Sequence, residues 1–190
     1  MEKNPDALAA RIVEHAQRQR RPEAPRDDES CREFAIRIAR DGTWFYHGSP
    51  IGRKPLVKLF ASVLRRDDKG AYWLITPAER GRIEVDDAPF AAVELRAEGE
   101  GKARALVFRT NVDDEVTADD AHPIRVETDA GTGEPSPYVL VRDRLEARIT
   151  RAVFYQLVDL GETREIAGKR VFGVASCGAF FALGTAGESW

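Results

Sequence analysis

Arginines stand at the start of two amphipathic segments of the chain, where they suit the binding of phosphate. Arg53 opens the first segment and Arg151 opens the second. Backbone N–H groups in the first turn of a helix lack partners within the helix and attract anions. A guanidinium adds two parallel donors that match a phosphate group. The pair predicts a phosphate-bearing ligand, held where the two segments meet.

Lys54 and Lys58 add positive charge beside this expected site. On a helical wheel they share a narrow stripe with Arg65, opposite an apolar face. The functional interpretation is an electrostatic field for an anion. The alternative is a solvated helix face with ordinary ion pairs. The pattern leaves both open.

Aromatic residues near the same segments supply candidate stacking surfaces for a base. Trp44 and Tyr155 are the rings we expect to stack, and His47, just before a glycine-containing loop, is placed to donate a hydrogen bond. Strand alternation puts Trp44 and Tyr46 on one face and Phe45 on the other, so part of this set must be core. Core packing is therefore the competing interpretation for each ring.

A hydrolytic enzyme is the second hypothesis, with Cys177, Ser176 or His47 as the reactive group. No Gly-x-Ser-x-Gly elbow surrounds Ser176, and no neighbouring residue marks a base for Cys177. Such an enzyme requires a stabilised thiolate or a base within hydrogen-bond reach. A tight turn that carries the following phenylalanines into the core is the structural alternative.

Metal and cofactor sites are not expected. His15, His47 and His122 lack metal-ligand spacing, and the acidic stretch 111–122 lacks the calcium-loop pattern. Cys31 and Cys177 are too few for a disulfide framework or a four-ligand zinc site, and their redox role stays open. We interpret 111–122 as a solvated loop. Whether it covers a binding cleft cannot be read from its composition.

The composition is that of a globular protein. Apolar residues make up 43% and charged residues 32% of the 190, and the longest apolar runs are far shorter than the roughly 20 residues needed to cross a bilayer. The first residues carry no export signal, so we expect a cytoplasmic protein. A net charge of −3 argues against a dedicated DNA-coating protein and leaves room for a local basic groove.

Periodicity predicts an N-terminal helix over 5–16, a solvated linker over 18–30, and then a β-hairpin. Residues 33–40 alternate, Asp41-Gly42 supplies the turn, and residues 43–46 return. A helix follows over 56–64, then strands at 72–75, 82–85, 90–95 and 103–108.

The hairpin pattern returns in the second half of the chain. Strands at 138–141 and 145–149 precede a helix over 151–160, which Thr150 can cap and Gly161 can end, and a strand at 171–174. We interpret this as a duplication; a chance match of two common amphipathic patterns is the alternative. The expected fold class is α+β with mostly antiparallel sheets. The expected domains are 1–30 (helix and linker), 31–97 (first repeat) and 98–190 (second repeat).

Four segments together resemble a bacterial family called domain of unknown function 1285: DGTWFYHGSPIGRKPLVKLFASVLRRD, YWLITPAERGRIEVDDAPF, YVLVRDRLEARITRAVFYQLVDLGE and SCGAFFALG. The resemblance covers most of the chain after the linker. It implies a duplicated core, a C-terminal half similar to pleckstrin-homology folds, and a pocket for a nucleotide or nucleic-acid-like ligand between the halves. It also implies a part in signalling, with a protein partner.

These observations converge on a non-enzymatic ligand-binding or signalling module. The residues expected to contact its phosphate-bearing ligand are Arg53, Lys54, Lys58, Arg151, Tyr155, Trp44 and His47, between the two repeats. The alternatives are the hydrolytic enzyme above and a protein–protein adaptor that uses a sheet edge.

Overall fold

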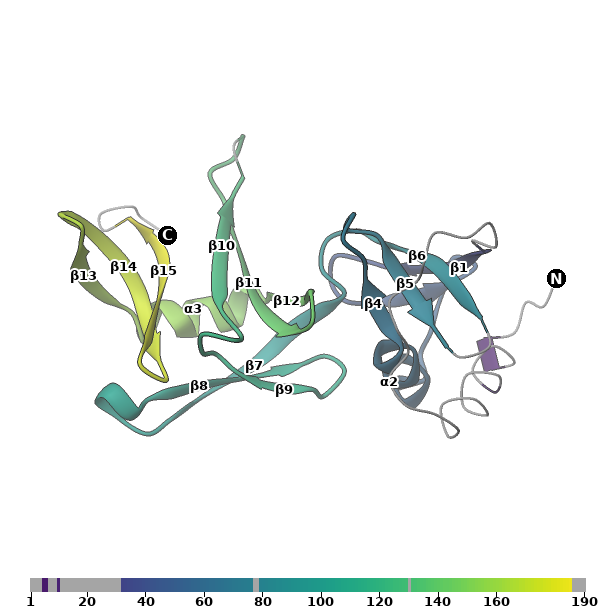
Figure 1. Cartoon of the computed structure of the whole chain (residues 1–190), viewed down its shortest axis with the longest axis horizontal. Helices are drawn as coiled ribbons and strands as arrows, with labels where there is room; N and C mark the ends of the chain where they lie inside the picture. Colours follow the sequence, from purple (N-terminus) through teal and green to yellow (C-terminus); the bar gives the residue numbers. More distant parts are fainter. Residues whose placement is uncertain (1–4, 7–9, 11–31, 77–78, 130, 186–190) are drawn as a thin grey trace. The chain divides into compact units, whose positions relative to one another are not determined.

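The computed structural model describes residues 5–6, 10, 32–76, 79–129 and 131–185. The chain divides into two compact units, Met1–Ala88 and Pro89–Trp190, and most of it is β-sheet (Figure 1). Most of the expected helix over 5–16 and the whole linker over 18–30 lie outside the described residues, as does Cys31. No helix among the described residues is both long and apolar enough to span a bilayer.

The N-terminal unit contains one six-stranded sheet in the order β3-β2-β1-β6-β5-β4. Its strands are β1 (Arg32–Ile38), β2 (Trp44–Tyr46), β3 (Ser49–Pro50), β4 (Leu64–Arg66), β5 (Tyr72–Ile75) and β6 (Arg80–Val85). All neighbours are antiparallel except β1 and β6, which run parallel. The predicted hairpin is confirmed, with Gly42 at a positive φ of 84° in its turn.

Helix α2 (Lys54–Ser62) packs against the inner face of this sheet. Leu56, Phe60 and Ala61 are buried, and the Phe60 ring stacks on Trp44 with ring centroids 6.3 Å apart. The helix ends two residues earlier than expected, because Val63 caps it and Leu64 begins β4. Arg65 therefore belongs to a strand and does not share the helical stripe of Lys54 and Lys58.

The C-terminal unit contains two sheets and one helix. The first sheet has the order β10-β11-β12-β7-β8-β9, and the second has the order β13-β14-β15. Its elements are β7 (Phe90–Glu98), η1 (Gly101–Ala103), β8 (Ala105–Thr110), β9 (Glu115–Thr117), β10 (Ile124–Thr128), β11 (Pro135–Arg142), β12 (Leu145–Ile149), α3 (Arg151–Asp159), β13 (Glu162–Ile166), β14 (Lys169–Ser176) and β15 (Ala179–Thr185). Gly161 follows the helix as expected, but Thr150 makes no side-chain cap.

The two units repeat one element order, as expected for a duplicated architecture. A hairpin, a helix and three antiparallel strands occur in this order as β1-β2-α2-β4-β5-β6, with the short strand β3 between β2 and α2, and again as β11-β12-α3-β13-β14-β15. The units use the hairpin differently. In the first, β6 joins β1 and makes one sheet; in the second, β12 pairs in parallel with β7.

Two expectations about the middle of the chain need correction. The compact units meet at residues 88 and 89, earlier than the expected boundary at 97 and 98, because β7 pairs with β8 and β12 of the C-terminal unit. The stretch 111–122 is not wholly a loop, because Glu115–Thr117 forms β9 against β8. Strands β3, β4, β13 and β15 were not expected from the sequence.

Candidate ligand-binding site

The pairing of the parallel strands β1 and β6 is irregular over part of their length, and both strands line a hollow in the N-terminal unit. Glu33 pairs with Arg82 and Arg37 pairs with Glu84, so residues 34–36 of β1 lie opposite Ile83 alone. The hollow has a volume of about 1210 Å³. A Cβ on Gly81 would come within 2.5 Å of the Phe34 ring, so that ring packs directly on the β6 backbone at the border of the hollow.

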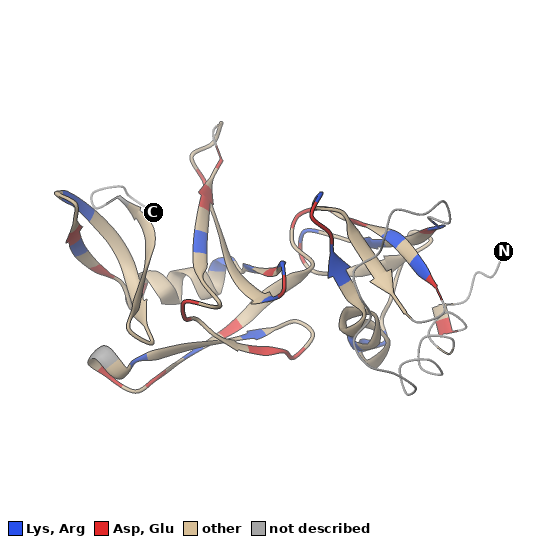
Figure 2. Cartoon of the chain, viewed as in Figure 1, with Lys and Arg blue, Asp and Glu red and all other residues tan. Residues whose placement is uncertain are grey.

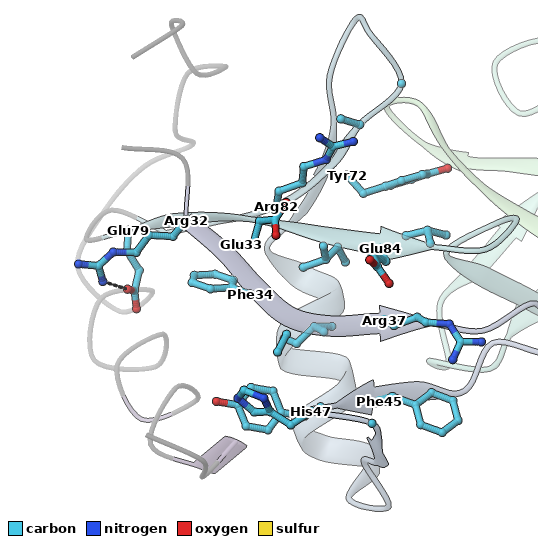
Figure 3. A pocket seen from close by; sticks show the side chains of 18 residues that line it. Arg32, Glu33, Phe34, Arg37, Phe45, His47, Tyr72, Glu79, Arg82 and Glu84 are labelled. Atoms are coloured by element: carbon cyan, nitrogen blue, oxygen red, sulfur yellow. Dashed lines mark ion pairs between the residues drawn. The ribbon is translucent and has the colours of Figure 1, made fainter. Parts of the chain in front are cut away.

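Charged side chains line this hollow because strand alternation turns them outward. On β1, Ile36 is 1% exposed while Arg37 is exposed, and on β6, Ile83 is buried between Arg82 and Glu84. Figure 3 shows Arg37, Arg82 and Glu84 projecting from the two strands, with α2 behind the sheet. The lining includes Arg32, Glu33, Phe34, Arg37, Phe45, His47, Tyr72, Glu79, Arg82 and Glu84.

Two of the three arginines of the hollow already have carboxylate partners. Arg32 lies 3.6 Å from Glu79, and Arg37 binds Asp86 through Nε at 2.9 Å and Nη2 at 2.8 Å. This two-pronged hydrogen bond raises the pKa of Arg37 and lowers that of Asp86. The guanidinium of Arg82 has no such partner among the described residues. Arg82 is therefore the cation of the hollow that is available to an anion.

Rings and an imidazole border the hollow on β2 and just after it. The Arg37 guanidinium lies 5.4 Å from the Phe45 ring centroid, a cation–π contact across the hairpin. His47 has a positive φ of 47° and donates its backbone N–H to Ala35 at 2.8 Å. Its imidazole meets the Tyr46 ring edge-on, with centroids 4.5 Å apart. The sequence-predicted His47 therefore lies at the hollow.

The cations predicted on α2 lie together, apart from the hollow's lining. Lys54 and Lys58 are exposed on one helix, and Arg53 precedes it in an ion pair with Asp6. The helix start offers fewer free donors than expected. Leu56 and Val57 donate to the Arg53 carbonyl at 3.0 and 3.2 Å, and Pro55, in the first turn, has no N–H.

Trp44 is core and offers no face to a ligand. Its side chain is 1% exposed and stacks on Phe60, because alternation turns it toward α2 while Phe45 faces outward. The competing interpretation of this ring as a core residue is therefore correct.

Arg151 and Tyr155 both lie on α3 of the C-terminal unit. Tyr155 is 51% exposed, and Arg151 lies 3.5 Å from Glu134 at an exposed position. The structure describes each unit by itself. A site that joins Arg151 to Arg53 remains a prediction.

Ser176 is engaged by backbone groups and is not placed as a nucleophile. It is fully buried, donates to the Ala118 carbonyl at 2.6 Å and accepts from the Leu106 N–H at 2.9 Å. Cys177 is exposed on the turn that follows, with a positive φ of 49°. Within the described residues, no cluster of three or more His, Cys, Asp or Glu side chains could hold a metal ion.

The comparisons with known proteins agree with the resemblance inferred from the motifs. Residues 24–88 match the N-terminal domain, and residues 89–183 the C-terminal domain, of a family described as protein of unknown function DUF1285. A crystal structure of a DUF1285 family protein from Silicibacter pomeroyi DSS-3 is similar, with 42% identity, a TM-score of 0.82, and coverage of 98% of this chain and 97% of that chain. The chain belongs to the DUF1285 family.

A second DUF1285 family structure is a more distant relative. It comes from Shewanella baltica OS155 and has 26% identity, a TM-score of 0.52, and coverage of 66% of this chain and 91% of that one. Among curated proteins, none matches this DUF1285 chain. Family membership thus supports the fold and leaves the function to be argued from the residues.

The sequence reasoning missed most of the hollow of this DUF1285 protein. Glu33 and Arg37 were visible as the polar positions of an alternating strand, and Arg82 and Glu84 as those of another. These residues come together only because β1 and β6, which are far apart in the chain, pair in parallel. A local sequence pattern does not predict that pairing.

Proposed function

We propose that this protein is a non-enzymatic ligand-binding or signalling module whose N-terminal unit holds a phosphate-bearing, nucleotide-like ligand in the hollow. One observation carries the proposal: the guanidinium of Arg82, which has no carboxylate partner among the described residues, at a hollow lined by both charged and aromatic side chains. The hollow's volume of about 1210 Å³ is above the usual range for a small-molecule pocket.

Arg82 is the group that binds phosphate in this proposal. A guanidinium offers two parallel N–H donors to phosphate oxygens, and a free one gives up no existing ion pair when it does so. Arg32 and Arg37 are held by Glu79 and Asp86, so they contribute less.

The mixed charge of the hollow suits a nucleotide better than a simple anion. Glu33 and Glu84 line it beside the arginines, and carboxylates accept hydrogen bonds from sugar hydroxyls and base amino groups. Phe45 supplies an apolar ring, and His47 a ring that donates or accepts a hydrogen bond. A nucleotide carries all the matching groups at once.

The remaining expectations belong to the same proposal. Arg53, Lys54 and Lys58 add positive field from α2, and Arg151 and Tyr155 of the C-terminal unit complete the site if the two units share it. The two sheets and the helix α3 of the C-terminal unit are compatible with a pleckstrin-homology-like module that meets a protein partner in the cytoplasm.

Two alternatives receive less support. The hydrolase hypothesis loses Ser176 as a candidate nucleophile, because its hydroxyl is hydrogen-bonded to two backbone groups. The adaptor would use an edge such as β13, which is exposed along its length. This edge carries Glu162, Arg164 and Glu165, and charged edges are typical of strands protected against pairing with another chain.

A thermal-shift panel of mononucleotides tests the proposal on the full chain. We expect at least one ribonucleotide to raise the melting temperature, and Arg82→Ala to remove that rise. The control is Arg170→Ala, which removes the same charge from an exposed position of the C-terminal unit. Arg53→Ala and Arg151→Ala test the contribution of the two helix starts. No stabilising nucleotide, or equal effects of Arg82→Ala and Arg170→Ala, would refute the proposal.

A further inference from the structure

Trp73 lies on the exposed face of the N-terminal sheet with arginines on both neighbouring strands. It pairs across with Arg65 on β4 and with Arg82 on β6. Arg80 lies two residues before Arg82 on β6, and its guanidinium is 6.0 Å from the Trp73 ring centroid. Directly opposed residues project on the same side of a sheet, so three arginines flank one indole. The Arg65 guanidinium also donates through Nη1 to the backbone carbonyls of Ser62 and Leu64 at 3.2 and 2.6 Å. Figure 2 shows the Lys and Arg positions of this sheet in blue.

The indole of Trp73 is fixed in orientation by the turn between β4 and β5. Its Nε1–H donates to Asp67 Oδ2 at 2.8 Å. The other oxygen of Asp67 accepts from the backbone N–H groups of Lys69 and Ala71 at 2.9 and 2.8 Å. The ring is thus held before any ligand arrives, which lowers the entropy cost of stacking on it.

Arg82 joins this cluster to the hollow. It stands opposite Trp73 on one side and opposite Glu33 on the other, and it lines the hollow itself. At the far side of the hollow the same face carries the pair Arg37 and Phe45. Three strand spacings of about 4.8 Å separate β5 from β2, or about 14 Å. A single base cannot stack on both Trp73 and Phe45 across that distance.

We propose that this face binds single-stranded nucleic acid, with one base on Trp73, its neighbours crossing the hollow, and phosphates on Arg65, Arg80 and Arg82. The inference rests on the proposed function and extends it from one nucleotide to a strand. Sheets that bind single strands present aromatic rings on an exposed face and hold the backbone with cations. Arginine also stacks on bases, so Arg80 above the indole extends the platform.

Fluorescence anisotropy with a labelled oligouridylate of about eight nucleotides tests this inference. We expect the oligomer to bind more tightly than uridine monophosphate. Trp73→Leu should weaken the binding of the oligomer about tenfold, because the stacking contact is lost, and should leave the affinity for the mononucleotide unchanged. Each of Arg65→Ala and Arg80→Ala should flatten the dependence of log affinity on log salt by about 0.7, as for one lost phosphate contact. Arg170→Ala is the matched control and should change neither.

Intrinsic fluorescence supplies a second readout if Trp73→Leu fails to fold. Oligomer binding should quench tryptophan emission in the wild type and in Trp44→Phe, and the quench should be lost in Trp73→Phe. If the oligomer binds no more tightly than the mononucleotide, or if loss of the Trp73 indole changes neither oligomer binding nor the quench, the inference is overturned while the proposed function stands. If neither the oligomer nor any mononucleotide of the thermal-shift panel binds, both are overturned.

Discussion

Replacing Ser176 by alanine should destabilise the C-terminal unit without touching any ligand site proposed for the protein. The Ser176 hydroxyl connects two backbone groups from distant segments, accepting from the Leu106 N–H at 2.9 Å and donating to the Ala118 carbonyl at 2.6 Å. All three residues are fully buried. Alanine leaves both backbone groups of this bridge without the partner that satisfied them.

The size of the effect follows from what is left unpaired. A buried polar group that loses its partner costs roughly 1–3 kcal/mol, so the two groups together should cost about 2–6 kcal/mol of unfolding free energy. With an m-value of about 2 kcal/mol per molar urea, the midpoint should fall by about 1–3 M. The slope itself should stay the same, because the surface exposed on unfolding hardly changes.

Urea unfolding followed by far-ultraviolet circular dichroism measures the midpoint, and hydrogen exchange at the Leu106 amide reports on the bridge itself. The control is Cys177→Ser, one residue further on at an exposed position, which should stay within about 0.5 kcal/mol. If Ser176→Ala matched this control in midpoint and in exchange at Leu106, the structural role assigned to the hydroxyl would be wrong.

Three further predictions concern single positions. Gly173→Ala should cost about 1–3 kcal/mol in thermal denaturation, because its Cβ would lie 2.2 Å from the Phe181 carbonyl, which is backbone and cannot swing away. Desolvation raises the pKa of Asp67, but hydrogen bonds from Trp73 and two backbone N–H groups together outweigh it and hold the pKa below its usual value. Trp73→Phe should therefore raise the pKa of Asp67 in an NMR titration. The stability that the Trp73 hydrogen bond gives to the ionised Asp67 is present above the unfolded pKa and lost as pH falls through the folded pKa. The wild type and Trp73→Phe should therefore converge in unfolding free energy at low pH. The Trp44 indole N–H finds no partner among the described residues, so Trp44→Phe should cost only packing, about 1–2 kcal/mol in urea unfolding, and a change in nucleotide affinity would contradict its place in the core.

Local patterns in the sequence predicted the elements whose causes are local. The Asp41-Gly42 turn fixed the first hairpin, since its residues suit the backbone that a tight turn requires. The apolar spacing of Leu56 and Phe60 predicted α2, and both side chains are buried. The same spacing extended the expected helix to Leu64, which instead pairs with Leu74 in β4. Tertiary strand pairing overrode the helical period there.

The candidate site depends on information that no local pattern holds. The outward positions of β1 and of β6 are each typical of a solvated strand face. Arg37 and Glu84 pair across these two strands although 47 positions of sequence separate them (84 − 37 = 47). Only that parallel pairing brings Arg82 beside Glu33, and only its interruption leaves Ile83 alone opposite residues 34–36. The helix starts, by contrast, were visible because a helix start has a local signature. The sequence therefore directed attention to Arg53, whereas the hollow is lined by strands of the sheet.

The balance of charges in the hollow decides which ligands the proposal can accommodate. Arg32 and Arg37 are neutralised within the unit, and Glu33 and Glu84 stand beside the one free guanidinium of the described lining, so the hollow alone has no excess of positive charge to attract a polyanion. A nucleotide can bind there through one phosphate contact and several hydrogen bonds. A strand needs further cations, and on the described face they come from Arg65 and Arg80 around Trp73. The salt dependence of binding distinguishes a nucleotide from a strand. A single phosphate contact gives a shallow slope of log affinity against log salt concentration, and a strand with several contacts gives a steep one.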